Sequence, residues 1–128
     1  MDLHTVALFG EAERGAFQTL FHLTNLIDLN HYLGNPPPYS EGIPNAIEIL
    51  YKNYHVLYIR VEEEGVALRD YYLGLKLLET EETSKKITGI MMPGVSDNDL
   101  IERCSFFCRK RASIILMNEK DLYDHLTN

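Results

Sequence analysis

The sequence predicts an α/β domain with a mostly parallel sheet of four to five strands and helices on both faces. Short apolar segments alternate along the chain with segments of helical periodicity, which is the order expected of βαβ units. The apolar segments are nearly continuous hydrophobic runs, as is typical of strands buried on both faces. The length of 128 residues corresponds to a single domain, residues 1–128.

Four apolar segments are predicted to be strands buried on both faces: residues 5–9, 55–61, 87–92 and 112–117. The second is the strongest prediction, because it is rich in β-branched and aromatic side chains. Gly10 ends the first strand and Gly94 follows the third, so turn residues separate the strands from what comes next.

Apolar residues at intervals of three and four, together with capping residues, predict five helices. They cover residues 25–33, 43–51, 66–79, 97–109 and 119–126. Ser96 or Asp97 caps the fourth helix and Asn118 the last. Cys104 and Cys108 lie four residues apart on one helical face, where we expect them to pack into the core. With the strands, these helices give a three-layer arrangement that resembles Rossmann-like domains in general.

Residues 16–53 form an insertion between the first two predicted strands. A simple crossover needs far fewer residues. The insertion contains a predicted helix that Gly34 ends, and a proline-rich loop over residues 35–42. Residues 18–23 fit either an extra strand or a helical turn. We expect the insertion to be either a lid over a site or a docking surface.

The charge balance argues against two classes of protein. Lys and Arg number 12 and Asp and Glu number 19, which gives a formal charge of −7. No nucleic acid is expected as partner, because phosphate contacts require basic surfaces. No membrane partner is expected either, because the chain has no apolar run of about 20 residues. The acidic start of the chain is unlike a signal peptide and predicts a cytoplasmic location.

A ligand site is expected beyond the carboxyl ends of the strands, where ligands of open α/β sheets bind. The loops that follow the strands supply two candidate catalytic acids, Glu11 and Glu62. The candidate ligand-binding residues lie in the same loops or at the strand ends: Gly10, Arg14, Arg60, Gly94, Ser96 and Asp97.

The loop over residues 93–97 is a candidate anion site, because free backbone N–H groups at a helix start attract anions. The alternative is ordinary capping by Asp97 and Asp99. Arg60 requires a partner, since a strand seldom contains an unpaired charge. That partner is expected to be a carboxylate, Glu62 or Glu11, or else an anionic ligand.

Two features of these loops bear on phosphate or metal binding. Gly10 and Gly15 have the glycine spacing of a P-loop, but Ala16 and Phe17 replace the required Lys and Ser or Thr. Residues 62–64 are three consecutive glutamates, and together with Glu11 and Asp97 they could hold Mg²⁺. The alternative is a solvated strand end. No zinc-ligand spacing occurs among the histidines, so no protein metal site is assigned.

Two functions follow from these patterns. The first is binding of a nucleotide or another small nucleotide-like molecule at the carboxyl edge, with hydrolysis as one option. The second is a non-enzymatic interaction or assembly module, acting as a homo-oligomer or with a partner protein. The contact surface would then be the proline-rich loop with a tyrosine cluster: Tyr51, Tyr54, Tyr58, Tyr71 and Tyr72.

Overall fold

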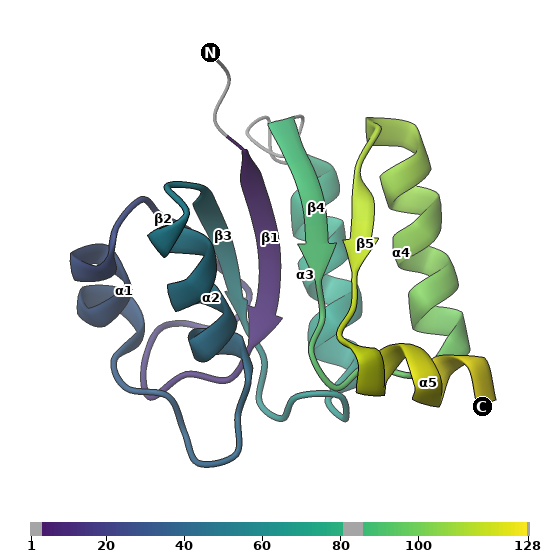
Figure 1. The fold of residues 1–128 in the computed structure, drawn as a ribbon, viewed down its shortest axis with the longest axis horizontal. Helices are drawn as coiled ribbons and strands as arrows, with labels where there is room; N and C mark the ends of the chain where they lie inside the picture. Colours follow the sequence, from purple (N-terminus) through teal and green to yellow (C-terminus); the bar gives the residue numbers. More distant parts are fainter. Residues whose placement is uncertain (1–3, 81–85, 128) are drawn as a thin grey trace.

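A five-stranded sheet with the order β2-β3-β1-β4-β5 forms the centre of the molecule (Figure 1). The computed structural model describes residues 4–80 and 86–127. The strands are β1 (Thr5–Gly10), β2 (Leu20–Leu23), β3 (His55–Arg60), β4 (Ile87–Met91) and β5 (Ile114–Leu116). All neighbouring pairs are parallel except β2 and β3, which are antiparallel. The predicted α/β class and the mostly parallel sheet are confirmed.

Five helices connect or flank these strands: α1 (Leu26–Leu33), α2 (Gly42–Tyr51), α3 (Leu68–Thr80), α4 (Asn98–Arg111) and α5 (Glu119–Thr127). The predicted caps are present, since Asp97 accepts from the N–H of Leu100 (2.9 Å) and Asn118 from that of Asp121 (2.7 Å). Among the described residues, no helix combines the length and the apolarity needed to cross a bilayer.

Both edges of the sheet differ from the prediction. Residues 18–23, which fitted two conformations, contain the strand β2, so the insertion adds an antiparallel edge strand next to β3. Residues 112–117 were predicted to be a strand buried on both faces, which is wrong. Only Ile114–Leu116 pair with β4, at the other edge, and Ile114 is 61% exposed. An apolar run alone does not distinguish an edge strand from a central one, since that depends on its neighbours.

Alternate residues of the strands point into two separate cores. Ala7 and Phe9 pack with α3 and α4, and the buried thiols of Cys104 and Cys108 belong to this core. Leu8 belongs to the other core, which α1 and α2 cover. In Figure 1, α2 lies in front of the sheet and α3 behind it, so we call these sides the front and back faces.

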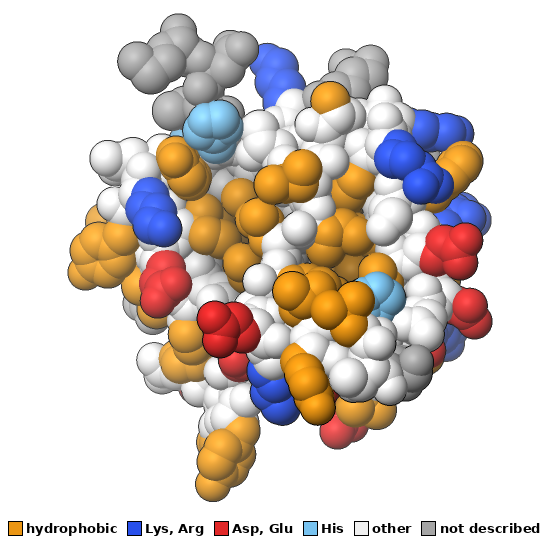
Figure 2. Space-filling view, turned by 45° about the vertical axis from the view of Figure 1, so that its right-hand side comes forward, with side chains coloured by type: hydrophobic (Ala, Val, Ile, Leu, Met, Phe, Trp, Pro, Cys, Tyr) orange, Lys and Arg blue, Asp and Glu red, His pale blue; other side chains and the backbone are white. Residues whose placement is uncertain are grey.

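The front face is covered over only part of its width. α2 packs on β1 and β3, whereas β4 and β5 are contacted by α4 from the back. By register, Met91 and Leu116 lie beside Leu8 on the front face, and Gly89 pairs with Ile114 in the same orientation. Figure 2 shows hydrophobic side chains gathered around a hollow on this side of the molecule. We call the front of β4 and β5 the uncovered face. Of the four residues on it, Ile114 is exposed, Met91 and Leu116 are half-buried and Gly89 is buried.

Candidate functional site

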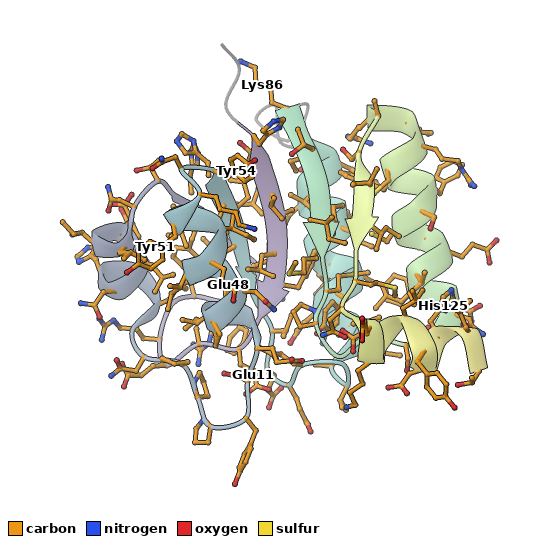
Figure 3. The ribbon with its side chains drawn as sticks, in the orientation of Figure 1. Glu11, Glu48, Tyr51, Tyr54, Lys86 and His125 are labelled. Carbon is orange, nitrogen blue, oxygen red and sulfur yellow. The ribbon has the colours of Figure 1, made fainter. Side chains whose placement is uncertain are left out.

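The carboxyl ends of β1, β3 and β4 meet at one edge of the sheet, where the sequence predicted a site. From β1 the chain passes to β3 on one side and later to β4 on the other. Strand order therefore reverses at β1, which is where ligands of open α/β sheets bind. Glu11, labelled in Figure 3, directly follows β1 at this edge.

The carboxylate of Glu64 is the centre of this edge. Its Oε2 accepts hydrogen bonds from the backbone N–H of Glu11 (2.8 Å) and of Gly42 (3.0 Å). Its Oε1 accepts from the N–H of Glu41 (2.8 Å). Residues 41 and 42 form the start of α2, whose own N-cap, Glu41, makes no side-chain capping bond. Glu64 thus supplies the negative charge that a helix N-terminus attracts.

Glu11 is bonded both to Glu64 and to Tyr58 of β3. Its Oε2 accepts from the N–H of Glu64 (2.9 Å), so the two residues bond reciprocally through side chain and backbone. The hydroxyl of Tyr58 donates to the carbonyl of Glu11 (2.7 Å). Burial, and next the charge of Glu64, raise the pKa of Tyr58 far above its usual value, so the hydroxyl remains a donor.

Four glycines allow the loops of this edge to approach one another. A Cβ built on Gly10 would lie 2.6 Å from the Cα of Gly42 and would also meet the hydroxyl of Tyr58. Gly65 and Gly94 both have positive φ, 81° and 83°, and an added Cβ on Gly65 would collide with Gly94. The glycines after the strands, which suggested a ligand site in the sequence, therefore allow the loops to pack closely against one another.

On the side of the edge next to α4 and α5, the side chains of Asp97 and Asp121 also form hydrogen bonds with backbone N–H groups of the chain. Asp97 caps α4, so the loop over residues 93–97 has the capping arrangement that was the alternative to anion binding. The carboxylate of Asp121, only 5% exposed, accepts from the N–H of Gly94 (3.0 Å). Ser96 is half-buried in the same loop.

The two arginines lie on the other side of the edge and contact backbone carbonyls. Arg60 donates to the carbonyl of Gly15 (2.7 Å) and its guanidinium lies 4.4 Å from the ring centre of Phe17. The prediction that Arg60 pairs with a carboxylate is therefore wrong. Arg14 donates to carbonyls at the end of α1, including that of His31 (3.3 Å), where a cation is favourable.

The second candidate acid, Glu62, is exposed, and its backbone N–H donates to Asp70 (2.8 Å). Within the described ranges, no three His, Cys, Asp or Glu side chains are placed to hold a metal ion. The structure thus bonds Glu11 to Glu64, packs Gly10 against Gly42, and packs Gly94 against Gly65 at the same edge. It leaves Arg14, Arg60 and Glu62 outside the hydrogen bonds around Glu64.

Glu64, Tyr58 and Asp121 belong to this edge but were not among the predicted catalytic or ligand-binding residues. The run of glutamates was a usable signal, since consecutive side chains cannot all face the same way. It did not show which of the three faces inward, because that depends on the position of α2.

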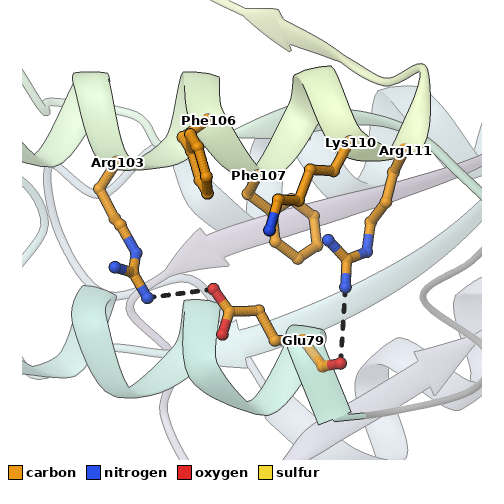
Figure 4. A pocket seen from close by; sticks show the side chains of 6 residues that line it. All are labelled: Glu79, Arg103, Phe106, Phe107, Lys110 and Arg111. Atoms are coloured by element: carbon orange, nitrogen blue, oxygen red, sulfur yellow. Dashed lines mark hydrogen bonds and ion pairs between the residues drawn. The ribbon is translucent and has the colours of Figure 1, made fainter.

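None of the predicted site residues lines either of two cavities in the described part of the chain. One of about 110 Å³ lies beside the carboxyl ends of β4 and β5 and is bounded by Asn45, Met91, Leu116 and Asp121 among others. The other, about 260 Å³, lies between α3 and α4 and contains the ion pair of Arg103 with Glu79 (3.1 Å; Figure 4).

Comparison with known proteins does not identify a relative. No family model matches the chain, and no curated protein and no solved structure matches it.

Replacing Glu64 by Gln should lower the free energy of unfolding by about 1–3 kcal/mol, because an amide NH₂ cannot accept one of the three N–H bonds. Urea unfolding followed by circular dichroism measures this. The control is Glu63→Gln, at an exposed neighbouring residue. Equal stability of the two variants would contradict the role given to Glu64.

The difference in stability between the natural chain and Glu64→Gln should also depend on pH. Burial raises the pKa of Glu64, and the three backbone N–H groups offset part of that rise. A raised pKa means that the folded state binds the proton more tightly, so this contribution to stability falls as pH rises from the usual value through the raised one. The stability advantage of the natural chain over Glu64→Gln should shrink across that window and stay constant above it. An advantage that grows there would refute the direction of the shift.

Gly10→Ala should destabilise the fold by about 1–3 kcal/mol, because the new Cβ collides with the backbone of Gly42. Gly89→Ala is the matched control. Its Cβ would meet the flexible side chain of Leu116 (3.0 Å) and would lie at an ordinary contact distance from the carbonyl of Ile114 (3.5 Å), so we expect a change below about 1 kcal/mol. Thermal unfolding of both variants makes the comparison. A similar loss of stability in both variants would contradict the claim that the close contact between Gly10 and Gly42 excludes a side chain.

Proposed function

We propose that this chain is a non-enzymatic interaction module that docks through the uncovered face of β4 and β5. The observation that carries this proposal is Ile114 of the edge strand β5, which is 61% exposed on the front of the sheet beside the half-buried Leu116 and Met91. Parallel sheets occur almost only with both faces covered by helices. Contiguous exposed apolar surface is typical of sites for association.

The state of the carboxyl edge supports the same proposal. The hydrogen bonds of Glu64, Glu11, Asp97 and Asp121 are made within the chain, so the start of α2 is already occupied by a carboxylate. The cavity beside β4 and β5, about 110 Å³, is smaller than the roughly 300 Å³ at which ligand pockets begin. It is of a size for a single side chain and not for a nucleotide.

The proposed surface differs from the tyrosine cluster expected from the sequence. Tyr58 and Tyr71 are fully buried and cannot contribute to a contact face. Tyr39, in the proline-rich loop, and Tyr51 are exposed. Tyr39 lies far along the chain from the uncovered face and is a useful control for it.

A nucleotide-binding, Rossmann-like domain is the second candidate. The reversal of strand order at β1 favours it, because such crevices bind nucleotides in doubly wound sheets. It requires that a ligand displace Glu64 from the start of α2. Glu11 would then be the available acid, with Mg²⁺ as one conceivable cofactor.

Two measurements on the same protein separate these functions. Binding of the apolar dye anilinonaphthalene sulfonate is followed with protein dilute enough to sediment as a monomer. We expect saturable binding that Ile114→Glu abolishes and that Tyr39→Ser leaves unchanged. Thermal unfolding with mono-, di- and trinucleotides, with and without Mg²⁺, should show no rise in Tm.

A saturable rise in Tm with one nucleotide, together with dye binding that Ile114→Glu does not alter, would reject the interaction module in favour of the second candidate. Circular dichroism of each variant confirms that the fold is retained.

A further inference from the structure

We infer that the proline-rich loop between α1 and α2 is a ligand for a polyproline-binding domain, whose groove takes the prolines at 36–38 together with Tyr39. This contact is separate from the uncovered face and does not depend on the function proposed there. Three features of the described residues lead to it: the extended backbone of the prolines, the full exposure of Tyr39, and the anchoring of the loop at both ends.

The prolines form an extended segment of the kind that such domains bind. Asn35, Pro36 and Pro37 each precede a proline, a position that is restricted to extended conformations. Pro36 and Pro38 are exposed and Pro37 is half-buried. A polyproline II helix has about three residues per turn, so these prolines make one turn of it. Aromatic-lined grooves recognise this helix because it is formed before binding.

A tight turn ends the extended segment at Tyr39. The N–H of Ser40 donates to the carbonyl of Pro37 (3.1 Å), so Pro38 and Tyr39 are the central residues of a β-turn. Tyr39 has a φ of 65°, and a turn with proline first and a positive φ second is of type II. The first central residue of that turn has a conformation close to polyproline II. The extended segment therefore continues through Pro38 and directly precedes Tyr39.

The side chain of Tyr39 is fully exposed. Its loop extends past the carboxyl ends of the strands, at the bottom of the view in Figure 1. A bulky residue seldom adopts a positive φ, and residues held in such conformations cluster at binding sites. A tyrosine has only two side-chain torsions, so its ring offers a large contact area at a small cost in entropy. Tyr39 is thus suited to enter a pocket of a partner beside the prolines.

Carboxylates hold both ends of the loop. The N–H of Asn35 donates to Glu13 (3.2 Å), and the N–H of Glu41 donates to Glu64 (2.8 Å). Because the ends are fixed and the prolines restrict the backbone between them, less freedom is lost when a partner binds. Loops that a folded scaffold positions in this way commonly carry binding residues.

The spacing of the residues selects the type of groove. Pro-x-x-Pro recognition needs a second proline three positions after the first. Residues 39–41, which lie three positions after the three prolines, are Tyr, Ser and Glu, so the loop lacks that spacing. The groove that fits takes adjacent proline rings between aromatic side chains and has a neighbouring pocket for a tyrosine. A WW domain, with its aromatic-lined polyproline groove, is the partner of this chemistry.

Isothermal titration calorimetry of the full chain with a panel of isolated WW domains tests this inference. We expect saturable one-to-one binding to at least one of them. Pro36→Ala and Tyr39→Ala should each raise the Kd about tenfold or more, because each removes a ring that the groove holds. Tyr51→Ala is the matched control, since it removes a tyrosine that is 73% exposed on α2, and it should leave the Kd unchanged.

Tyr39→Gly separates binding from folding. Glycine adopts a positive φ without strain, so this variant should have a Tm at least as high as that of Tyr39→Ala. Its binding to the WW domain should nevertheless be lost. Neither variant should change binding of the apolar dye, so failure of this inference and failure of the proposed function are distinguishable.

Three results would overturn the inference. The first is the absence of saturable binding to every WW domain of the panel. The second is binding that Tyr39→Ala or Tyr39→Gly leaves intact. The third is binding to SH3 domains in place of WW domains, which would contradict the groove type derived from the residue spacing.

Discussion

The carboxylate of Glu64 determines how the carboxyl edge of the sheet is closed. It accepts hydrogen bonds from the loop after β1 and from the start of α2, two segments with β2 and α1 between them in the sequence. α2 has no side-chain cap of its own, so its free N–H groups depend on a residue 22 or 23 positions further along the chain. Because Glu11 bonds back to Glu64, the loops after β1 and β3 are held as one unit.

This closure has a consequence for function. A helix start beside the end of β1 would otherwise be a natural place for an anionic ligand, and here the chain fills it with its own carboxylate. Among the described residues, no buried side-chain nitrogen or oxygen lacks a hydrogen-bond partner. Exposed apolar surface is found instead at the edge of the sheet, where Ile114 of β5 is 61% exposed. We therefore propose binding at this apolar edge and not at the start of α2.

Much of the fold was predictable, because periodicity and capping are local properties. The four parallel strands and the five helices correspond to predicted segments, and Asp97 and Asn118 cap their helices as expected. The predictions failed at the two edges of the sheet. β2 is a short antiparallel strand inside the insertion, and β5 is a half-exposed edge, and both properties depend on which strands lie alongside.

The sequence by itself determined the class of fold, the direction of most strands and the concentration of acids after the strand ends. Only the tertiary structure decided which of those acids act together. Three consecutive glutamates are equivalent as sequence, but the position of α2 selects Glu64 and leaves Glu62 in solvent. Arg60 needed a partner, and the path of the insertion supplied a carbonyl and an aromatic ring in place of a carboxylate. Hydrogen bonds between distant segments depend on the packing of the whole chain, which local patterns do not encode.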